Sequence, residues 1–205
     1  MVDLTTASEL IVALGRRLDA RGLAPATAGN YSIRLADESI AITVSGAHKG
    51  RLAADQVMRV SAAGTSLDGK KPSAETLLHC LIYEIDPGAG AVLHTHSVAG
   101  TVLSRALAGS PSILLQDYEV LKAFPGVASH EVRLAMPLID NSQDMPAMAA
   151  RLRALLGSDS ARLPAFYIRG HGLYAWGPTI EAAETIVEAS EFLIACAWEE
   201  RKATR

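Results

Sequence analysis

The sequence predicts an α/β fold of three layers, with helices on both faces of a central mixed, largely antiparallel sheet. Segments of helical periodicity alternate with short segments rich in β-branched residues, which is typical of layered α/β proteins. Hairpin signals between neighbouring strand segments favour a mixed sheet over a purely parallel one. We find no internal repeat, low-complexity segment or linker, and therefore expect a single domain over residues 1–205.

The first half of the chain is expected to contribute two helices and three strands. Thr6 and Glu9 form a candidate capping box before an amphipathic helix that closes at Gly22. The other elements expected here are a hairpin of strands 29–35 and 39–46, a helix over 74–85 capped by Ser73, and a strand over 89–96.

The second half is expected to end on a long helix from Pro178 to about Lys202. Its glutamates recur at helical spacing and predict one solvated stripe, formed by Glu181, Glu184, Glu188 and Glu191. The elements expected before it are a helix over 97–107, a strand and helical turn within 112–126, a strand over 130–139, a helix over 145–158, and a strand pair over 165–177 broken at Gly170 and Gly172.

Composition excludes several classes of partner. A net charge of −3 provides no basic field for nucleic acid or for an anionic membrane surface. The N-terminus lacks the pattern of a signal peptide, and no apolar run approaches the roughly 20 residues of a membrane-spanning helix. Cys80 and Cys196 lie far apart in helix-like segments, so we expect reduced, buried thiols in a cytoplasmic protein.

Two of the six histidines, His94 and His96, follow the apolar run at 91–93. Alternate residues of a strand share a face, so both imidazoles can reach one cation. Two histidines hydrogen-bonded within a core would give the same pattern. A catalytic zinc takes about three protein ligands and leaves one position open, which predicts a third ligand near another strand end.

His171 is the best candidate for the third ligand, because the glycines on either side leave room for an approaching ion or substrate. A turn histidine between ordinary turn glycines is the alternative. The other histidines, His48, His79 and His130, lie in less open settings, and His79 is most simply a helix residue.

Three turns of small residues and hydrogen-bond donors predict a phosphate site. These are residues 27–32, 44–51 and 70–75, whose exposed amides can form anion nests to which Lys49 and Arg51 add charge. Ser73 lies at a helix N-terminus, which favours anions. Each turn alone is weak evidence, because turns are generally built from such residues.

Taken together, these motifs resemble the class II aldolase family, which includes fuculose-1-phosphate aldolase and ribulose-5-phosphate 4-epimerase. The resemblance covers nearly the whole chain and rests on "GN" at 29–30, "SG" at 45–46, "PSAE" at 72–75, "HTH" at 94–96 and "GHG" at 170–172. It implies a class II aldolase-like fold, one zinc ion per subunit bound by His94, His96 and His171, and a small phosphorylated ketose as substrate. The substrate-binding residues that it implies, with Lys49 added from the turn analysis, are Gly29, Asn30, Ser45, Gly46, Lys49 and Ser73.

The stretches "VSGAHKGRL", "YEVLKAFPG" and "FYIRGHGLYAWG" are most similar to the branch of the family that dehydrates a 1-phosphoketose. This similarity implies that Glu119 and Glu75 are the catalytic acid and base. It does not decide which of the two is the acid and which is the base. A helix returning over the open metal position could bring Glu119 to the site. On the local sequence alone, an exposed glutamate near Lys122 is the alternative.

The same residues are compatible with other functions. An aldolase or epimerase acting on another small sugar phosphate would use the same metal site. A non-enzymatic protein in which zinc only stabilises the fold would need a fourth protein ligand for the metal, and neither cysteine has the spacing to provide one. The resemblance also implies a homotetramer with its sites at subunit boundaries.

Overall fold

The computed structural model describes residues 2–157 and 163–204. Its sheet has eight strands in the order β3-β2-β1-β4-β8-β7-β6-β5. All neighbouring pairs are antiparallel except β6 and β7, which are parallel. The strands are β1 (Asn30–Arg34), β2 (Ile40–Thr43), β3 (Val57–Val60), β4 (Ala91–Thr95), β5 (Ser112–Gln116), β6 (Arg133–Ile139), β7 (Ala165–Ile168) and β8 (Gly172–Gly177). The mixed, largely antiparallel sheet is confirmed.

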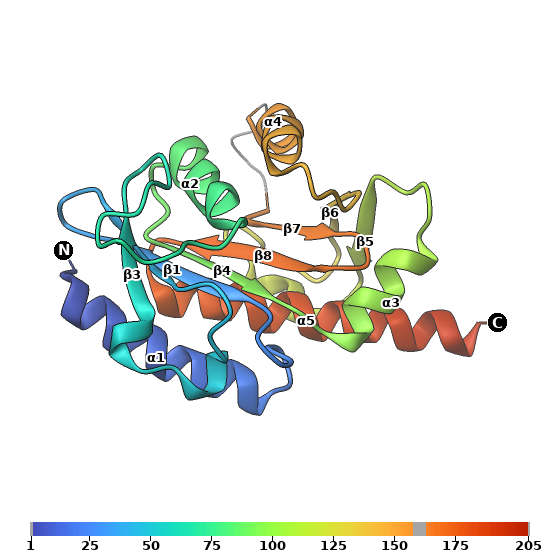
Figure 1. Ribbon diagram of the computed structural model, residues 1–205. Helices are drawn as coiled ribbons and strands as arrows, with labels where there is room; N and C mark the ends of the chain where they lie inside the picture. The colour runs from blue at the N-terminus through green and yellow to red at the C-terminus, as the bar shows by residue number, and fades with distance from the viewer. Residues whose placement is uncertain (1, 158–162, 205) are drawn as a thin grey trace.

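Helices cover both faces of the sheet (Figure 1). One face carries α2 (Thr76–Ile85) and α4 (Met145–Leu156), and the other carries α1 (Leu4–Ala20), α3 (Val98–Ala106) and α5 (Ile180–Ala203). Three short 3₁₀ turns complete the described elements: η1 (Lys49–Arg51), η2 (Ala54–Gln56) and η3 (Glu119–Ala123). Within the described ranges, no helix combines the length and apolar character that a bilayer crossing requires.

The alternation of side chains along β4 divides the core into two parts. Ala91 and Leu93 pack on the α1/α5 side, whereas Val92 packs on the α2/α4 side. His94 has the same parity as Val92 and faces α2, while Thr95 faces α5 and donates a hydrogen bond to Glu191. The face of the sheet toward α2 therefore receives the first histidine of the pair.

One local prediction needs correction, one strand was not predicted, and one predicted helix residue lies outside the described residues. Helix α1 is capped by Asp3, whose side chain accepts from the Thr6 amide, so Thr6 and Glu9 form no capping box. Strand β3 was not predicted, because 3₁₀ turns rather than a hairpin turn join it to β2. Ser158, the last residue of the predicted fourth helix, lies outside the described residues.

The predicted solvated stripe of glutamates is confirmed only in part, because Glu184 is half-buried and Glu191 is buried. Glu181 and Glu188 are exposed, but Glu191 is 8% exposed, because α5 passes beneath β4 there and meets Thr95. Burial raises the pKa of Glu191, and hydrogen bonds from Ser97 and Thr95 oppose that rise. Phe192, the next residue along the helix, is exposed instead.

Candidate active site

Three histidines meet at one edge of the sheet. The ligand nitrogens of His94, His96 and His171 all lie within 4.8 Å of one another. His94 is fully buried at the end of β4, and His96 follows it with its backbone amide bonded to the Leu23 carbonyl. His171 lies in the turn between β7 and β8. The structure thus brings together the three residues that the sequence predicts as metal ligands.

Gly172 makes this close approach possible. A Cβ at position 172 would lie 2.3 Å from the Thr95 carbonyl oxygen and 2.7 Å from Cε1 of His94. Both distances are shorter than any side chain tolerates, so only glycine lets the start of β8 lie directly against the histidine pair.

The surroundings of His94 prepare it as a metal ligand. Its Nδ1–H donates to the Leu173 carbonyl at 2.9 Å, which fixes the tautomer and leaves a lone pair on Nε2. Nε2 is buried and has no hydrogen-bond partner among the described residues. The ring stacks on Tyr174, with centroids 4.1 Å apart. An orphaned ring nitrogen that carries a lone pair and faces two further imidazoles fits a metal ion.

His96 is also held in the form that a metal binds. Burial, together with the neighbouring His94, lowers the pKa of His96 to about 3, so its imidazole is neutral at physiological pH. A neutral ring has a free lone pair on one nitrogen.

Glu75 points its carboxylate into the histidine cluster. It is the N-cap residue of α2, and its Oε1 lies 3.0 Å from Nε2 of His171 and 3.4 Å from Nε2 of His94. Its Oε2 accepts a 2.6 Å hydrogen bond from Nδ2 of Asn30. Burial raises the pKa of Glu75, but the contacts with His171 and His94 outweigh it and hold that pKa well below its usual range. Glu75 is therefore an ionised carboxylate beside the metal position.

The predicted phosphate residues line one cavity of about 380 Å³ that opens on the cluster. Its walls include the predicted substrate-binding residues Gly29, Asn30, Ser45, Gly46, Lys49 and Ser73, together with Glu75, His96 and His171. A Cβ on Gly29 would lie 2.8 Å from the His94 carbonyl, so glycine is needed there as well. The structure brings these residues together from five separate stretches of the chain.

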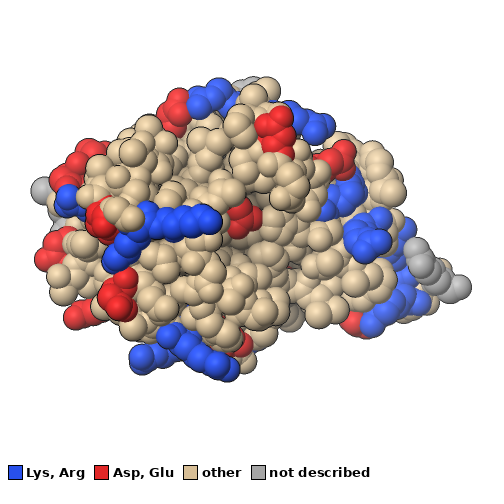
Figure 2. Space-filling view, viewed as in Figure 1, with Lys and Arg blue, Asp and Glu red and all other residues tan. Residues whose placement is uncertain are grey.

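Lys49 is a buried cation in the wall of this cavity. Its Nζ donates to the carbonyls of Thr27 and Ala47, at 2.8 and 2.6 Å. An ammonium has three donors, so one remains for a ligand. Burial lowers the pKa of Lys49 to about 8, although the charge of Glu75 acts in the opposite direction. The visible face of the molecule carries both acidic and basic side chains (Figure 2).

A second cavity of about 510 Å³ borders the cluster on its other side. It shares His96 and His171 with the first cavity, and its wall includes Val98 and Val102, which are 82% and 38% exposed. The histidines therefore lie between a polar cavity and one with an apolar wall.

Comparisons with known proteins agree with this geometry. The family model for the class II aldolase and adducin N-terminal domain matches residues 9–198. The chain belongs to this family.

Several curated proteins are similar in sequence to this protein over most of its length. Methylthioribulose-1-phosphate dehydratase from Acidiphilium cryptum is 50% identical over 97% of this chain and 93% of its own length. The protein of the same name from Gluconacetobacter diazotrophicus is 52% identical over 95% and 94%. The corresponding Pseudomonas aeruginosa protein is 50% identical over 92% of each chain.

Solved structures share the class II aldolase fold. YgbL from Escherichia coli superimposes with a TM-score of 0.78 at 27% identity, covering 91% of this chain and 86% of its own. L-Fuculose 1-phosphate aldolase superimposes with a TM-score of 0.80 at 18% identity, covering 100% and 90%. At that identity the second likeness shows the fold alone.

Glu119 is the one predicted site residue that the structure does not bring to the cluster. Its carboxylate is exposed on η3 and pairs with Lys122 and, at 3.7 Å, with His130. The hydrogen bond from Lys122 lowers the pKa of Glu119. Glu119 lines neither of the two cavities beside the histidines.

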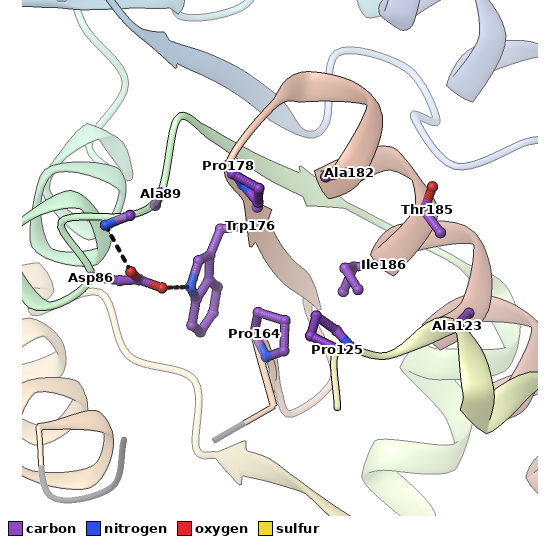
Figure 3. A pocket seen from close by; sticks show the side chains of 12 residues that line it. Asp86, Ala89, Ala123, Pro125, Pro164, Trp176, Pro178, Ala182, Thr185 and Ile186 are labelled. Carbon is purple, nitrogen blue, oxygen red and sulfur yellow. Dashed lines mark hydrogen bonds between the residues drawn. The ribbon is translucent and has the colours of Figure 1, made fainter. Parts of the chain in front are cut away.

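The strand directions explain why Glu119 is remote. The parallel strands β6 and β7 both end at the His171 edge of the sheet, whereas antiparallel β5 ends beside the start of β6. The seven residues of β6 separate the two edges by about 23 Å at the usual rise per residue. The end of η3 and the residues after it border a different cavity, which Ala123 and Pro125 line together with Trp176 and Pro178 (Figure 3). The expected helix that returns Glu119 over its own metal position is therefore wrong.

Sequence reasoning missed a polar chain behind Glu75. His79 is a helix residue, as predicted, but it is fully buried and hydrogen-bonds to Asn30 and Ser32. The signal was present in the spacing, because residues four apart on a helix share a face and Glu75 precedes His79 by one turn.

Proposed function

We propose that the protein catalyses the dehydration of 5-methylthioribulose 1-phosphate to 5-methylthio-2,3-dioxopentyl phosphate, a step of methionine salvage. The observation that carries this proposal is the identity of 50–52% with proteins named methylthioribulose-1-phosphate dehydratase, over more than nine-tenths of the chain. The site supports it with a histidine cluster, an ionised carboxylate and a cavity that contains a buried cation.

We assign zinc as the metal, held by His94, His96 and His171. When bound, zinc supplies Lewis acidity, which makes the hydrogen next to the substrate carbonyl more acidic. Three imidazoles with one open position are a typical catalytic zinc site.

The residues of the polar cavity bind the substrate's phosphate. Lys49 offers its remaining N–H, and Ser45 and Ser73 offer hydroxyls from two separate turns. This anchoring orients the substrate's C3 toward Glu75, and positioning of this kind can supply several kcal/mol of a barrier. The methylthio end extends toward the apolar wall formed by Val98 and Val102.

Glu75 acts as the base in this scheme. Its Oε1 takes the proton from C3 of the substrate while Asn30 holds Oε2. The electron pair of the C3–H bond forms a C3–C4 double bond, and the C4 hydroxyl leaves with a proton as water. The resulting enol tautomerises to the 2,3-diketone, so the C3–C4 bond is never broken.

Glu119 of a neighbouring subunit donates the proton to the departing hydroxyl. The strand directions support this assignment, because they place Glu119 about 20 Å or more from the histidine cluster of its own chain. We accordingly propose a homotetramer of single-domain chains, working in the cytoplasm with both cysteines free.

Trapping the product tests the reaction. The zinc-loaded protein is incubated with 5-methylthioribulose 1-phosphate and then with o-phenylenediamine, which condenses with a 1,2-diketone to a quinoxaline. We expect one quinoxaline for each substrate consumed. Release of dihydroxyacetone phosphate, detected with glycerol-3-phosphate dehydrogenase, would instead identify an aldolase acting on the same site.

A further inference from the structure

A chain of buried hydrogen bonds runs from the interior of the protein to the carboxylate of Glu75. Tyr83 OH lies 2.9 Å from Ser32 Oγ, and Ser32 Oγ lies 2.8 Å from Nδ1 of His79. Nε2 of His79 lies 2.5 Å from Oδ1 of Asn30, and Nδ2 of Asn30 lies 2.6 Å from Glu75. This series of hydrogen bonds alternates between residues of α2 and residues of β1 and ends at Glu75, the N-cap residue of α2.

The chemistry of these groups fixes the direction of every proton. Nδ2 of Asn30 donates to Oε2 of Glu75, so the other end of the amide, the carbonyl oxygen Oδ1, faces Nε2 of His79. A carbonyl cannot donate, so Nε2 of His79 carries a hydrogen. Burial and the nearby His94 lower the pKa of His79 to about 3, which leaves its Nδ1 as an acceptor.

Ser32 has a single proton to give. Nδ1 of His79 lies at 2.8 Å, whereas the competing Val92 carbonyl lies at 3.5 Å, so the proton goes to His79. Ser32 Oγ therefore accepts from Tyr83, whose hydroxyl stays protonated because burial raises its pKa. The protons all point the same way, from Tyr83 through His79 to Glu75.

We propose that His79 is a positioning residue for the base: its Nε2–H holds the Asn30 amide in the one orientation that donates to Glu75. With His79 in place, Oε2 of Glu75 is held by Asn30 and Oε1 is directed at the histidine cluster. Without it, the amide can rotate and present its carbonyl to the carboxylate, which repels the base from that position.

A pair of amide substitutions at position 79 separates this role from simple packing. Glutamine places its amide nitrogen near the position of Nε2 and can still donate to Asn30. Asparagine reaches only the position of Nδ1 and cannot. The two side chains share their chemistry and both are smaller than the ring they replace, so the pair isolates the Nε2–H bond. Cys80→Ala, at the neighbouring buried position of α2, controls for loss of packing in that helix.

The kinetic arm rests on the proposed dehydration. We expect H79N to lose kcat by about 10- to 100-fold, the usual cost of losing a group that orients a metal-site residue, with KM and bound zinc nearly unchanged. H79Q and C80A should keep most of the wild-type kcat. Equal losses in H79N and H79Q, or a loss in H79N matched by lost zinc, would overturn the positioning role.

A second arm is independent of any substrate. Nitrogen-15 NMR of the wild-type protein should show His79 with its hydrogen on Nε2, and the Asn30 side-chain amide with one strongly downfield proton. H79N should lose that downfield proton and H79Q should retain it. Hydrogen on Nδ1 of His79 would refute the positioning role of His79 even if the protein dehydrates its substrate. If the spectra are as expected but the protein performs no dehydration, the positioning role stands and only the proposed reaction is rejected.

Discussion

A mixture of two inactive variants tests whether Glu119 works across a subunit boundary. Glu119→Gln removes the proposed acid and should lose on the order of 10²–10⁴ in rate, and His171→Ala removes a metal ligand. The opposite ends of β6 lie about 23 Å apart, so no site assembled from one chain contains both Glu119 and its own histidines. Each variant alone should therefore be nearly inactive for a different reason.

Hybrid tetramers should recover activity in a proportion set by chance. A working site needs an intact His171 from one subunit and an intact Glu119 from its neighbour. In an equal random mixture each has a probability of one half, so about one quarter of the sites are intact. The assay measures dehydration in the whole tetramer population purified from equal co-expression of the two variants.

A matched pair of variants provides the control. Glu75 and His171 belong to the same site of the same chain, with Oε1 of Glu75 3.0 Å from Nε2 of His171. Co-expressed Glu75→Gln and His171→Ala chains should therefore recover nothing. Hybrid Glu119/His171 tetramers as inactive as their parents would refute the boundary site, and near-normal dehydration by Glu119→Gln alone would move the role to Glu75.

Four further predictions concern the metal, the phosphate cavity and the backbone around them. His171→Ala should retain less than one zinc per subunit by atomic absorption, and stoichiometric zinc in an active variant would refute the three-ligand assignment. Ser73→Ala should raise KM more than it lowers kcat, and equal turnover of a dephosphorylated substrate would remove the phosphate role of this cavity. Because burial lowers the pKa of Lys49 to about 8, its ammonium loses its charge above that pH, so kcat/KM should fall as pH rises through about 8 in the wild type. The same fall in Lys49→Met would assign it to another group. Gly172→Ala should lower the free energy of unfolding, measured in urea, by about 1–3 kcal/mol and should reduce bound zinc, because its Cβ would lie 2.3 Å from the Thr95 carbonyl oxygen. Unchanged stability would show that the turn at His171 can move away from Thr95 without cost.

The sequence predicted which three histidines lie together and which turns line the polar cavity, because both depend on local rules. The parity of a strand places His94 and His96 on one face, and glycines mark the points where chain segments must approach closely. The strand pair that carries His171 was also recognisable from its pattern. These features require no knowledge of how distant strands pair.

What the sequence could not supply depends on long-range arrangement. The pairing and direction of the strands decide at which end of the strands Glu119 lies, and no local pattern gives that pairing. Glu191 follows the helical spacing of its exposed neighbours, yet it is buried where α5 crosses β4. His79 resembles an ordinary helix residue until the fold places Asn30 and Ser32 beside its ring.

The central claim is that the protein removes water from its substrate while leaving the C3–C4 bond intact. The most direct test uses 5-methylthioribulose 1-phosphate labelled with carbon-13 at both C3 and C4, incubated with the zinc-loaded protein and followed by NMR. Dehydration predicts that both labels remain in one phosphorylated product and keep their one-bond carbon–carbon coupling as C3 becomes a ketone. Loss of that coupling, with the two labels divided between dihydroxyacetone phosphate and an aldehyde, would contradict it.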